Sequence, residues 1–263
     1  MSASYLVVTD LDGTLLDHHS YSWQPASEAL DLLKARNIPL VLCSSKTAAE
    51  MQALREALKL DAPFIVENGA AIYLPDEQGN TEIVDFGKNR SDFLPLLERI
   101  RSTGDYRFTG FSDMNVTDVM AATGLEESAA VNALQRQFTE PVLWQDTLAN
   151  RDRFVQQVRK SGLDAVQGGR FLHVSTGCDK GRAVDWLRGW YAKTYGHSPE
   201  VIALGDSDND VSMLESADLP VLVKSPVKAY PQVRNSNTYR TRGTGPAGWN
   251  EAIMKIIENQ DRK

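Results

Sequence analysis

Five short apolar runs rich in β-branched residues, each ending at polar residues, constrain the fold of this 263-residue chain most strongly. They are YLVVT (5–9), IPLVLC (38–43), PFIV (63–66), VIALG (201–205) and LPVLV (219–223). Runs of this kind are typical of buried strands in a parallel sheet. Helical patterns at 25–36 and 47–60 separate the first three runs, and the second places Met51, Leu54 and Leu58 on one face. The alternation predicts βαβ units and an α/β fold.

The pattern changes between residues 86 and 176. Helix-like SDFLPLLERI and strand-like DYRFTGF are followed by two helical stretches near 115–138, strand-like PVLWQ, another helix, and strand-like DAVQ and RFLHVS. A helix at DKGRAVDWLRGWYAK and the strand-then-loop pattern VIALGDSDND come next. We therefore expect an α+β domain (86–176) inserted into a core formed by 1–85 and 177–263. Such an insertion is suited to act as a lid over the carboxyl edge of the sheet, where open α/β folds bind ligands.

Net charge and cysteine content narrow the classes of partner. A formal net charge of -7 argues against nucleic acid held on a basic face. No apolar stretch reaches the roughly 18 residues of a membrane span, and the start MSASYLVVTDLDG has no basic region before its apolar run. We expect no membrane partner and a cytoplasmic protein. The two cysteines, Cys43 and Cys178, support neither a disulfide framework nor a zinc site.

The first chemical motif is Asp10-Leu11-Asp12-Gly13-Thr14, directly after the first predicted strand. Residues two apart on an extended backbone project the same way, so Asp10 and Asp12 can face one reacting centre. One carboxylate can attack phosphorus while the other protonates the leaving alkoxide and then activates water. Taken alone, an Asp-Gly turn that closes a strand explains the motif equally well.

The second motif is Gly205-Asp206-Ser207-Asp208-Asn209-Asp210, after another apolar strand. Hard oxygen ligands clustered in a loop suit Mg²⁺, and two acidic loops at two strand ends can share one cation. The motif is not an EF-hand, since position six is Val211 rather than Gly and position twelve is Ala217 rather than Glu. A solvated acidic turn is the alternative.

Donors for a phosphate group occur in two places. Ser44, Ser45 and Lys46 lie between the second strand and the next helix, where hydroxyls, backbone N–H groups and an ammonium converge at a helix N-terminus. Ser-Ser is equally suited to cap that helix. Lys180 opens a later helix, which is unfavourable for a cation unless negative charge lies beside it.

Other phosphate chemistries fail on spacing. A cysteine phosphatase loop needs Arg six residues after its nucleophile, but the residue six after Cys43 is Ala49. No GxxxxGK[ST] occurs, which excludes a P-loop. His18, His19, His173 and His197 show no HExxH or metal-ligand spacing.

The four ordered motifs DLDGT, Ser after the second strand, Lys at a helix start and GDSDND together resemble the haloacid dehalogenase superfamily. The insertion resembles the C2B-type cap of its Cof-like branch, as does the segment Glu67-Asn68-Gly69-Ala70. The resemblance implies a doubly wound parallel-sheet core with an inserted α+β cap domain. It also implies that Asp10 is the nucleophile, that Asp12 is the acid and base, and that Ser44, Lys180 and Asn209 bind phosphate. Ser45 and Lys46, from their place at the helix N-terminus, complete the predicted phosphate-binding set. The Mg²⁺ ligands that the resemblance implies are Asp10, Asp206, Asp210 and the Leu11 carbonyl, rather than the Asp12 side chain.

A narrower resemblance is to the mannosyl-3-phosphoglycerate phosphatases, through SSKT (44–47), the cap stretch TGLEESAAVNALQRQFTEP, GGRFLHVSTGCDKG and GPAGWNEA. It implies a small phosphorylated glycerate substrate bearing a sugar. The candidate cap contacts with that substrate are Arg136, Glu140, Gly168, Gly169 and Arg170. A broad sugar phosphatase, a phosphomutase and a phospho-accepting regulatory module stay open as alternatives, and so does the oligomeric state.

Overall fold

The computed structural model describes residues 5–76 and 78–260, and the contacts within it divide the chain into two compact units. The first unit comprises Met1–Ser44, Ala62–Ile65 and Asp179–Lys263, and the second comprises Ser45–Asp61 and Val66–Cys178. The second unit therefore includes segments on the amino-terminal side of residue 86. The domain boundaries at 86 and 176 stay a prediction from the sequence.

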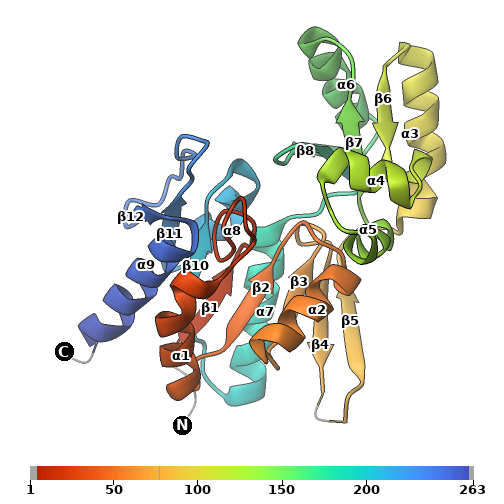
Figure 1. Cartoon of the computed structure of the whole chain (residues 1–263). Helices are drawn as coiled ribbons and strands as arrows, with labels where there is room; N and C mark the ends of the chain where they lie inside the picture. The colour runs from red at the N-terminus through yellow and green to blue at the C-terminus, as the bar shows by residue number, and fades with distance from the viewer. Residues whose placement is uncertain (1–4, 77, 261–263) are drawn as a thin grey trace. The chain divides into compact units, whose positions relative to one another are not determined.

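The first unit is built on parallel strands (Figure 1). They are β1 (Tyr5–Thr9), β2 (Leu40–Cys43), β3 (Phe64–Val66, whose last residue belongs to the second unit), β10 (Glu200–Gly205), β11 (Leu219–Lys224) and β12 (Tyr239–Thr244). Their order is β12-β11-β10-β1-β2-β3, and each neighbouring pair is parallel. All five apolar runs form strands, which confirms the predicted parallel α/β sheet.

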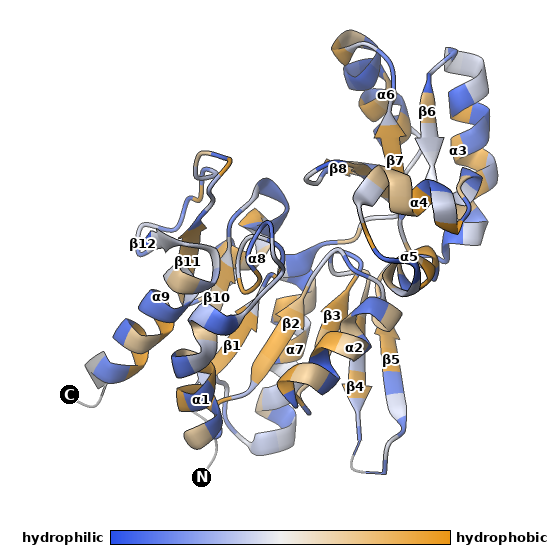
Figure 2. Ribbon diagram, in the orientation of Figure 1, coloured by the Kyte–Doolittle hydropathy of each residue, from blue (hydrophilic) through white to orange (hydrophobic). Residues whose placement is uncertain are grey.

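The first unit contains long helices, which bury one apolar face each, and short helical turns. They are η1 (Gln24–Ala26), α1 (Ser27–Ala35), α7 (Lys180–Tyr195), η3 (Asp208–Asp210), α8 (Val211–Glu215) and α9 (Gly245–Gln260). In α7 the buried apolar residues recur at helical spacing as Ala183, Val184, Leu187 and Tyr191. Figure 2 shows β1, β2, β3 and β10 as mostly apolar, whereas the helices carry both apolar and polar residues. Among the helices of residues 5–76 and 78–260, none has the length and apolar character needed to cross a membrane.

The second unit has an α+β architecture. It contains α2 (Ala48–Leu58), the antiparallel hairpin β4 (Ala71–Pro75) and β5 (Thr81–Asp85), α3 (Arg90–Gly104), β6 (Phe108–Gly110), η2 (Phe111–Asp113), α4 (Val116–Thr123), α5 (Glu127–Leu134), β7 (Glu140–Trp144), α6 (Leu148–Lys160), β8 (Asp164–Gln167) and β9 (Leu172–Ser175). Strands β6, β7, β9 and β8 form an antiparallel sheet in that order. The predicted elements between 91 and 175 are all present, with ends that differ by a few residues.

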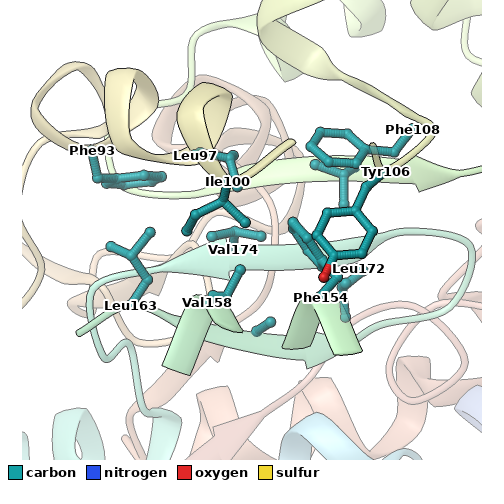
Figure 3. Packing of buried hydrophobic residues seen from close by; sticks show 12 residues of the cluster. Phe93, Leu97, Ile100, Tyr106, Phe108, Phe154, Val158, Leu163, Leu172 and Val174 are labelled. Carbon is teal, nitrogen blue, oxygen red and sulfur yellow. The ribbon is translucent and has the colours of Figure 1, made fainter. Parts of the chain in front are cut away.

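One apolar cluster holds α3 and α6 against the four-stranded sheet (Figure 3). Phe93, Leu97 and Ile100 of α3 meet Phe154 and Val158 of α6. The sheet contributes Phe108, Val142, Ala165, Leu172 and Val174. Edge-to-face and tilted contacts of Phe154 with Tyr106 and Phe108, at centroid distances of 5.4 and 5.2 Å, add to the burial. This core gives the second unit an interior of its own.

Candidate active site

The register of β1 and β10 brings two acidic motifs together. Thr9 is paired with Leu204, and the N–H of Asp10 donates to the carbonyl of Leu204 at 2.9 Å. Asp10 therefore leaves β1 at the edge of the sheet where Asp206 leaves β10. Oxygens of Asp10, Asp206 and Asp210 all lie within 4.8 Å of one another, and the three side chains are buried. Two motifs 196 residues apart in sequence thus form one carboxylate cluster (206 − 10 = 196).

Lys180 lies inside this cluster. Its Nζ donates to Asp10 Oδ1 at 2.7 Å, to Asp210 Oδ1 at 2.6 Å and to the carbonyl of Cys43 at 3.2 Å. The side chain is only 1% exposed. A cation in the first turn of α7 is unfavourable beside the positive end of the helix dipole, and the two carboxylates supply the opposing charge that the sequence called for.

The loop after β10 is folded around Asp210. Its Oδ2 accepts hydrogen bonds from the backbone N–H groups of Asp206 and Ser207, both at 3.1 Å. A Cβ on Gly205 would lie 2.5 Å from the Cβ of Asp210, so only glycine allows this approach. Asp210 therefore shapes the loop with one oxygen while the other oxygen holds Lys180.

Gly13 lets the first motif approach the second. Its φ is +84°, and a Cβ there would lie 2.8 Å from Asp206 Oδ2. The hydroxyl of Thr14 donates to Asp206 Oδ1 at 3.4 Å. Glycine is therefore required both by the backbone conformation and by the closeness of the carboxylate.

Two supporting residues, Thr9 and Trp249, were missed by the sequence reasoning. The indole N–H of Trp249 in α9 donates to Thr9 Oγ1 at 3.0 Å, and this hydroxyl donates to the carbonyl of Asp10 at 2.7 Å. Both residues are fully buried. These two hydrogen bonds link α9 to the backbone of Asp10 and fix the position from which its side chain extends. The only sequence signal was the segment GPAGWNEA, which pointed to a family and not to a contact.

The charges in the cluster shift one another's protonation. Burial, followed by the Asp210 carboxylate, raises the pKa of Asp10 to about 8, against the lowering effect of Lys180. Burial and Asp210 also raise the pKa of Asp206 to about 6. Burial alone would lower the pKa of Lys180, but Asp10 and Asp210 outweigh it, and the pKa lies above its usual range. The ammonium is therefore charged, and Asp10 and Asp206 keep their protons to a higher pH than an ordinary aspartate does.

This donor set fits a divalent cation. With all three carboxylates ionised, the cluster and its ammonium would carry a net charge of about -2, which a divalent cation would balance. Carboxylate oxygens are the ligands that Mg²⁺ prefers. The carbonyl of Leu11 already accepts the N–H groups of Thr14 at 3.0 Å and Leu16 at 2.8 Å, which makes it the weakest member of the proposed ligand set.

The remaining predicted core residues are spread over both units. Asp12 is half-buried two residues after Asp10. Ser44 is buried at the end of β2, and its N–H donates to the carbonyl of Ile65 at 3.1 Å. Ser45 and Lys46 belong to the second unit. In the loop after β10, the side-chain oxygen of Asn209 accepts from the hydroxyl of Ser207 at 2.6 Å.

Among the predicted cap contacts, Glu140 is buried and Arg136 is half-buried. Glu140 Oε1 accepts both the N–H and the hydroxyl of Ser112 at 2.7 Å, and Oε2 accepts from Arg90 at 3.0 Å. Burial raises the pKa of Glu140, and the bonds from Ser112 partly offset that effect. Arg136 donates to groups of its own unit. Substrate contact by either residue stays a prediction.

The other three cap residues lie around the turn between β8 and β9. Gly168 donates its N–H to the carbonyl of Phe171 at 2.9 Å, and a Cβ on it would lie 2.9 Å from the ring of His173. Gly169 and Arg170 are exposed, and the Arg170 guanidinium contacts the carbonyl of Ala122. Exposure leaves this turn open to a ligand, and its role stays a prediction.

Comparison with known proteins agrees with the geometry. The model of the haloacid dehalogenase-like hydrolases matches residues 7–117 and 142–242. A glucosyl-3-phosphoglycerate/mannosyl-3-phosphoglycerate phosphatase of Methanococcoides burtonii is 37% identical over 96% of this chain and 97% of its own length. A phosphatase of the same name from Persephonella marina is 35% identical, with 98% of each chain covered.

A solved structure extends the likeness to the fold. A phosphatase of the haloalkanoate superfamily from Bacteroides thetaiotaomicron matches 98% of this chain and 96% of its own, with a TM-score of 0.70 and 19% identity. The predicted parallel-sheet core with an α+β insertion is confirmed by this fold. The motifs from both ends of the sequence, the sheet that joins them and the matches over nearly the whole length agree, and the chain belongs to the haloacid dehalogenase-like hydrolase family.

Proposed function

We propose that the protein is a Mg²⁺-dependent phosphatase that removes the phosphate of a sugar-bearing 3-phosphoglycerate. The favoured substrate is 2-O-(α-mannosyl)-3-phosphoglycerate, and the products are mannosylglycerate and phosphate. The names of both relatives include a 3-phosphoglycerate, which supports that part of the proposed substrate. Both names give the glucosyl compound as well as the mannosyl compound. A cytoplasmic location stays a prediction.

The observation that carries the proposal is the buried cluster at the carboxyl ends of β1 and β10. Asp10 has one oxygen held by Lys180, and a second carboxyl group, that of Asp12, follows two residues later. Mg²⁺ held by Asp10, Asp206 and Asp210 would keep these carboxylates ionised and offset the charge of the phosphoryl group. Asp10 in that state has the charge and the fixed position that a nucleophile needs.

In the proposed first step, an Asp10 carboxylate oxygen attacks phosphorus in line with the ester bond. An O–P bond forms to Asp10, the P–O bond to glycerate breaks, and Asp12 gives its proton to the departing oxygen. The ammonium of Lys180 and the hydroxyl of Ser44 stabilise the charge spread over the phosphoryl oxygens. The product of this step is an aspartyl-phosphate and a free alcohol.

In the second step, Asp12 accepts a proton from water as the water oxygen attacks the aspartyl-phosphate. The bond between phosphorus and Asp10 breaks, and the carboxylate is regenerated with release of inorganic phosphate. Each residue thus returns to its starting state. The inserted α+β segment would select the alcohol that is released.

The proposed function is tested by phosphate release from mannosyl- and glucosyl-3-phosphoglycerate and mannose phosphates, with and without Mg²⁺. We expect fastest release from the mannosyl compound and none after removal of divalent ions. Equal rates on all esters would instead indicate a broad sugar phosphatase. Transfer to sugar that depends on a bisphosphate would indicate a mutase, and a long-lived phosphoprotein a regulatory module.

The nucleophile is tested by Asp10→Asn. The amide is nearly isosteric but cannot attack phosphorus as an anion, so we expect turnover to be abolished. The circular dichroism spectrum should match that of the wild type, since the amide keeps the shape of the side chain and Asp210 still pairs with Lys180. Full activity in this variant would refute the assignment of Asp10.

A further inference from the structure

Three consecutive residues after Ser44 are each held by a different hydrogen bond. Arg136 Nη1 donates to the carbonyl of Ser45 at 3.1 Å. The N–H of Glu67 donates to the carbonyl of Lys46 at 3.0 Å. The hydroxyl of Thr47 donates to the carbonyl of Asn132 at 2.9 Å. Residues 45–47 are thus held by hydrogen bonds within the second unit, and they directly follow a proposed phosphate ligand, Ser44.

The terminal nitrogens of Arg136 contact groups of the protein. Its side chain is only 6% exposed, and Nη1 also donates to Thr139 Oγ1 at 2.9 Å. Carboxylate oxygens of Glu50 and Glu67 each lie 3.9 Å from its guanidinium nitrogens. The buried Nε has no acceptor within the described residues. The contacts of the terminal nitrogens therefore determine the position of the side chain. Arg136 therefore connects the Ser45 carbonyl to the carboxylates of Glu50 and Glu67.

Glu67 fixes the segment that carries Arg136. Its carboxylate accepts the N–H groups of Gln137 at 2.8 Å, Phe138 at 3.1 Å and Thr139 at 2.8 Å, and the hydroxyl of Thr139 at 2.7 Å. Its backbone is left-handed, with φ of +48°. The N–H of the same residue holds Lys46. Glu67 and Arg136 therefore form a closed network that joins 45–47 to 136–139.

We propose that Arg136 is a positioning residue for the phosphate-binding loop, residues 44–47, and does not contact the sugar or the glycerate. The proposal rests on the proposed function, because it assumes that this loop binds phosphate. Arg136 acts through the Ser45 carbonyl and fixes the peptide unit that follows Ser44. A loop that is held by its backbone binds phosphate in the same way whichever alcohol the phosphate is attached to.

The test compares Arg136→Met with Arg136→Lys and with Arg159→Met as a matched control. Arg159 also donates to a carboxylate and a carbonyl of its own unit, those of Asp164 at 3.0 Å and Ala165 at 3.2 Å, but lies outside the network. For each variant, kcat/KM is measured on mannosyl-3-phosphoglycerate and on p-nitrophenyl phosphate, together with inhibition by inorganic phosphate. Thermal unfolding shows whether each variant is folded.

A positioning role predicts that Arg136→Met lowers kcat/KM by about 10- to 100-fold on both esters alike and weakens inhibition by inorganic phosphate. Arg136→Lys should recover part of the loss, and Arg159→Met should behave as the wild type. A loss confined to the mannosyl substrate, with unchanged phosphate inhibition, would overturn the proposal in favour of direct substrate contact.

A second measurement needs no turnover. Hydrogen exchange of the backbone amides in residues 44–50 should be faster in folded Arg136→Met than in the wild type and in Arg159→Met. Unchanged exchange would overturn the assignment to the loop. Wild-type protein that releases no phosphate from any ester would overturn the proposed function, and so the two failures are distinguishable.

Discussion

Single residues in the carboxylate cluster depend on one another because they are buried together. The ammonium of Lys180 lies within 2.7 Å of two carboxylate oxygens in a region that water scarcely reaches. Removal of the charge of one such group leaves the charges of its partners uncompensated. The loss of stability is several-fold larger for a broken buried ion pair than for a broken surface ion pair.

Lys180→Met should therefore destabilise the fold by about 3–5 kcal/mol above about pH 8, where Asp10 and Asp210 are both ionised and would face each other without a cation. The loss should shrink as the pH falls, since protonation removes the repulsion. Denaturant unfolding at several pH values checks this, with Lys193→Met in the exposed last turn of α7 as the control. Equal effects of the two substitutions would contradict the role given to Lys180.

The sequence placed the charged members of the site but not the residues that hold them. Asp10, Asp206 and Asp210 could be predicted because each follows a recognisable strand in a short motif. Thr9 and Trp249 could not, since they are 240 positions apart and no periodic pattern signals a contact between them. The four hydrogen bonds accepted by Glu67 could not be predicted for the same reason. They form only because folding brings together segments about 70 residues apart in the sequence.

At the scale of elements, the close packing of α7 against α8 sets the position of Lys180. A Cβ on Gly181 would lie 2.5 Å from the carbonyl oxygen of Ser212 in α8, too near for any side chain without a shift. Farther along α7, Gly189 has no heavy atom within 4 Å of such a Cβ. There is therefore room for a side chain at Gly189 but not at Gly181.

Gly181→Ala should move the first turn of α7 away from α8 and lower kcat/KM by about 10- to 100-fold, because Lys180 and the carboxylates would no longer be aligned. Gly189→Ala should leave activity unchanged and stabilise the protein by about 0.5–1 kcal/mol through helix propensity. Steady-state kinetics and thermal unfolding of both variants are the measurements. Wild-type kinetics in Gly181→Ala would show that this packing does not matter.

Elements with strong apolar runs were predicted well, and exposed ones were not. The run PFIV became β3 almost residue for residue. The hairpin β4–β5 was not predicted, because β5 (TEIVD) is mostly exposed and the connection between its strands is longer than a two-residue turn. Amphipathic helices such as α2 were recovered because burial of one face leaves a periodic pattern.

At the scale of the whole molecule, stability should depend on pH and metal together. The pKa values of Asp10, about 8, and Asp206, about 6, lie above the usual 3.8 of an aspartate. The folded, metal-free protein therefore holds protons that the unfolded chain has lost. The stability that these groups contribute is full below about pH 4 and is lost as the pH rises through 6 and then 8.

We expect the melting temperature of the metal-free protein to fall between pH 5 and pH 8, and Mg²⁺ to raise it most at pH 8, since the cation binds the ionised carboxylates. Thermal unfolding in chelator and in Mg²⁺ across this range is the measurement. Asp206→Asn should lose the metal effect, whereas Asp208→Asn, exposed in the same loop, should keep it. If the rise in melting temperature caused by Mg²⁺ does not change with pH, metal binding does not depend on the ionisation of these carboxylates, and the prediction is wrong.

The pairing of β1 with β10 also has a consequence for synthesis on the ribosome. Tyr5 is opposite Glu200, so 195 residues must be added after Tyr5 before the start of the partner strand exists (200 − 5 = 195). At typical translation rates this delay is about 10 to 40 s. Throughout that time one edge of an apolar strand lacks its native neighbour, and the nascent chain offers a surface that chaperones are suited to cover.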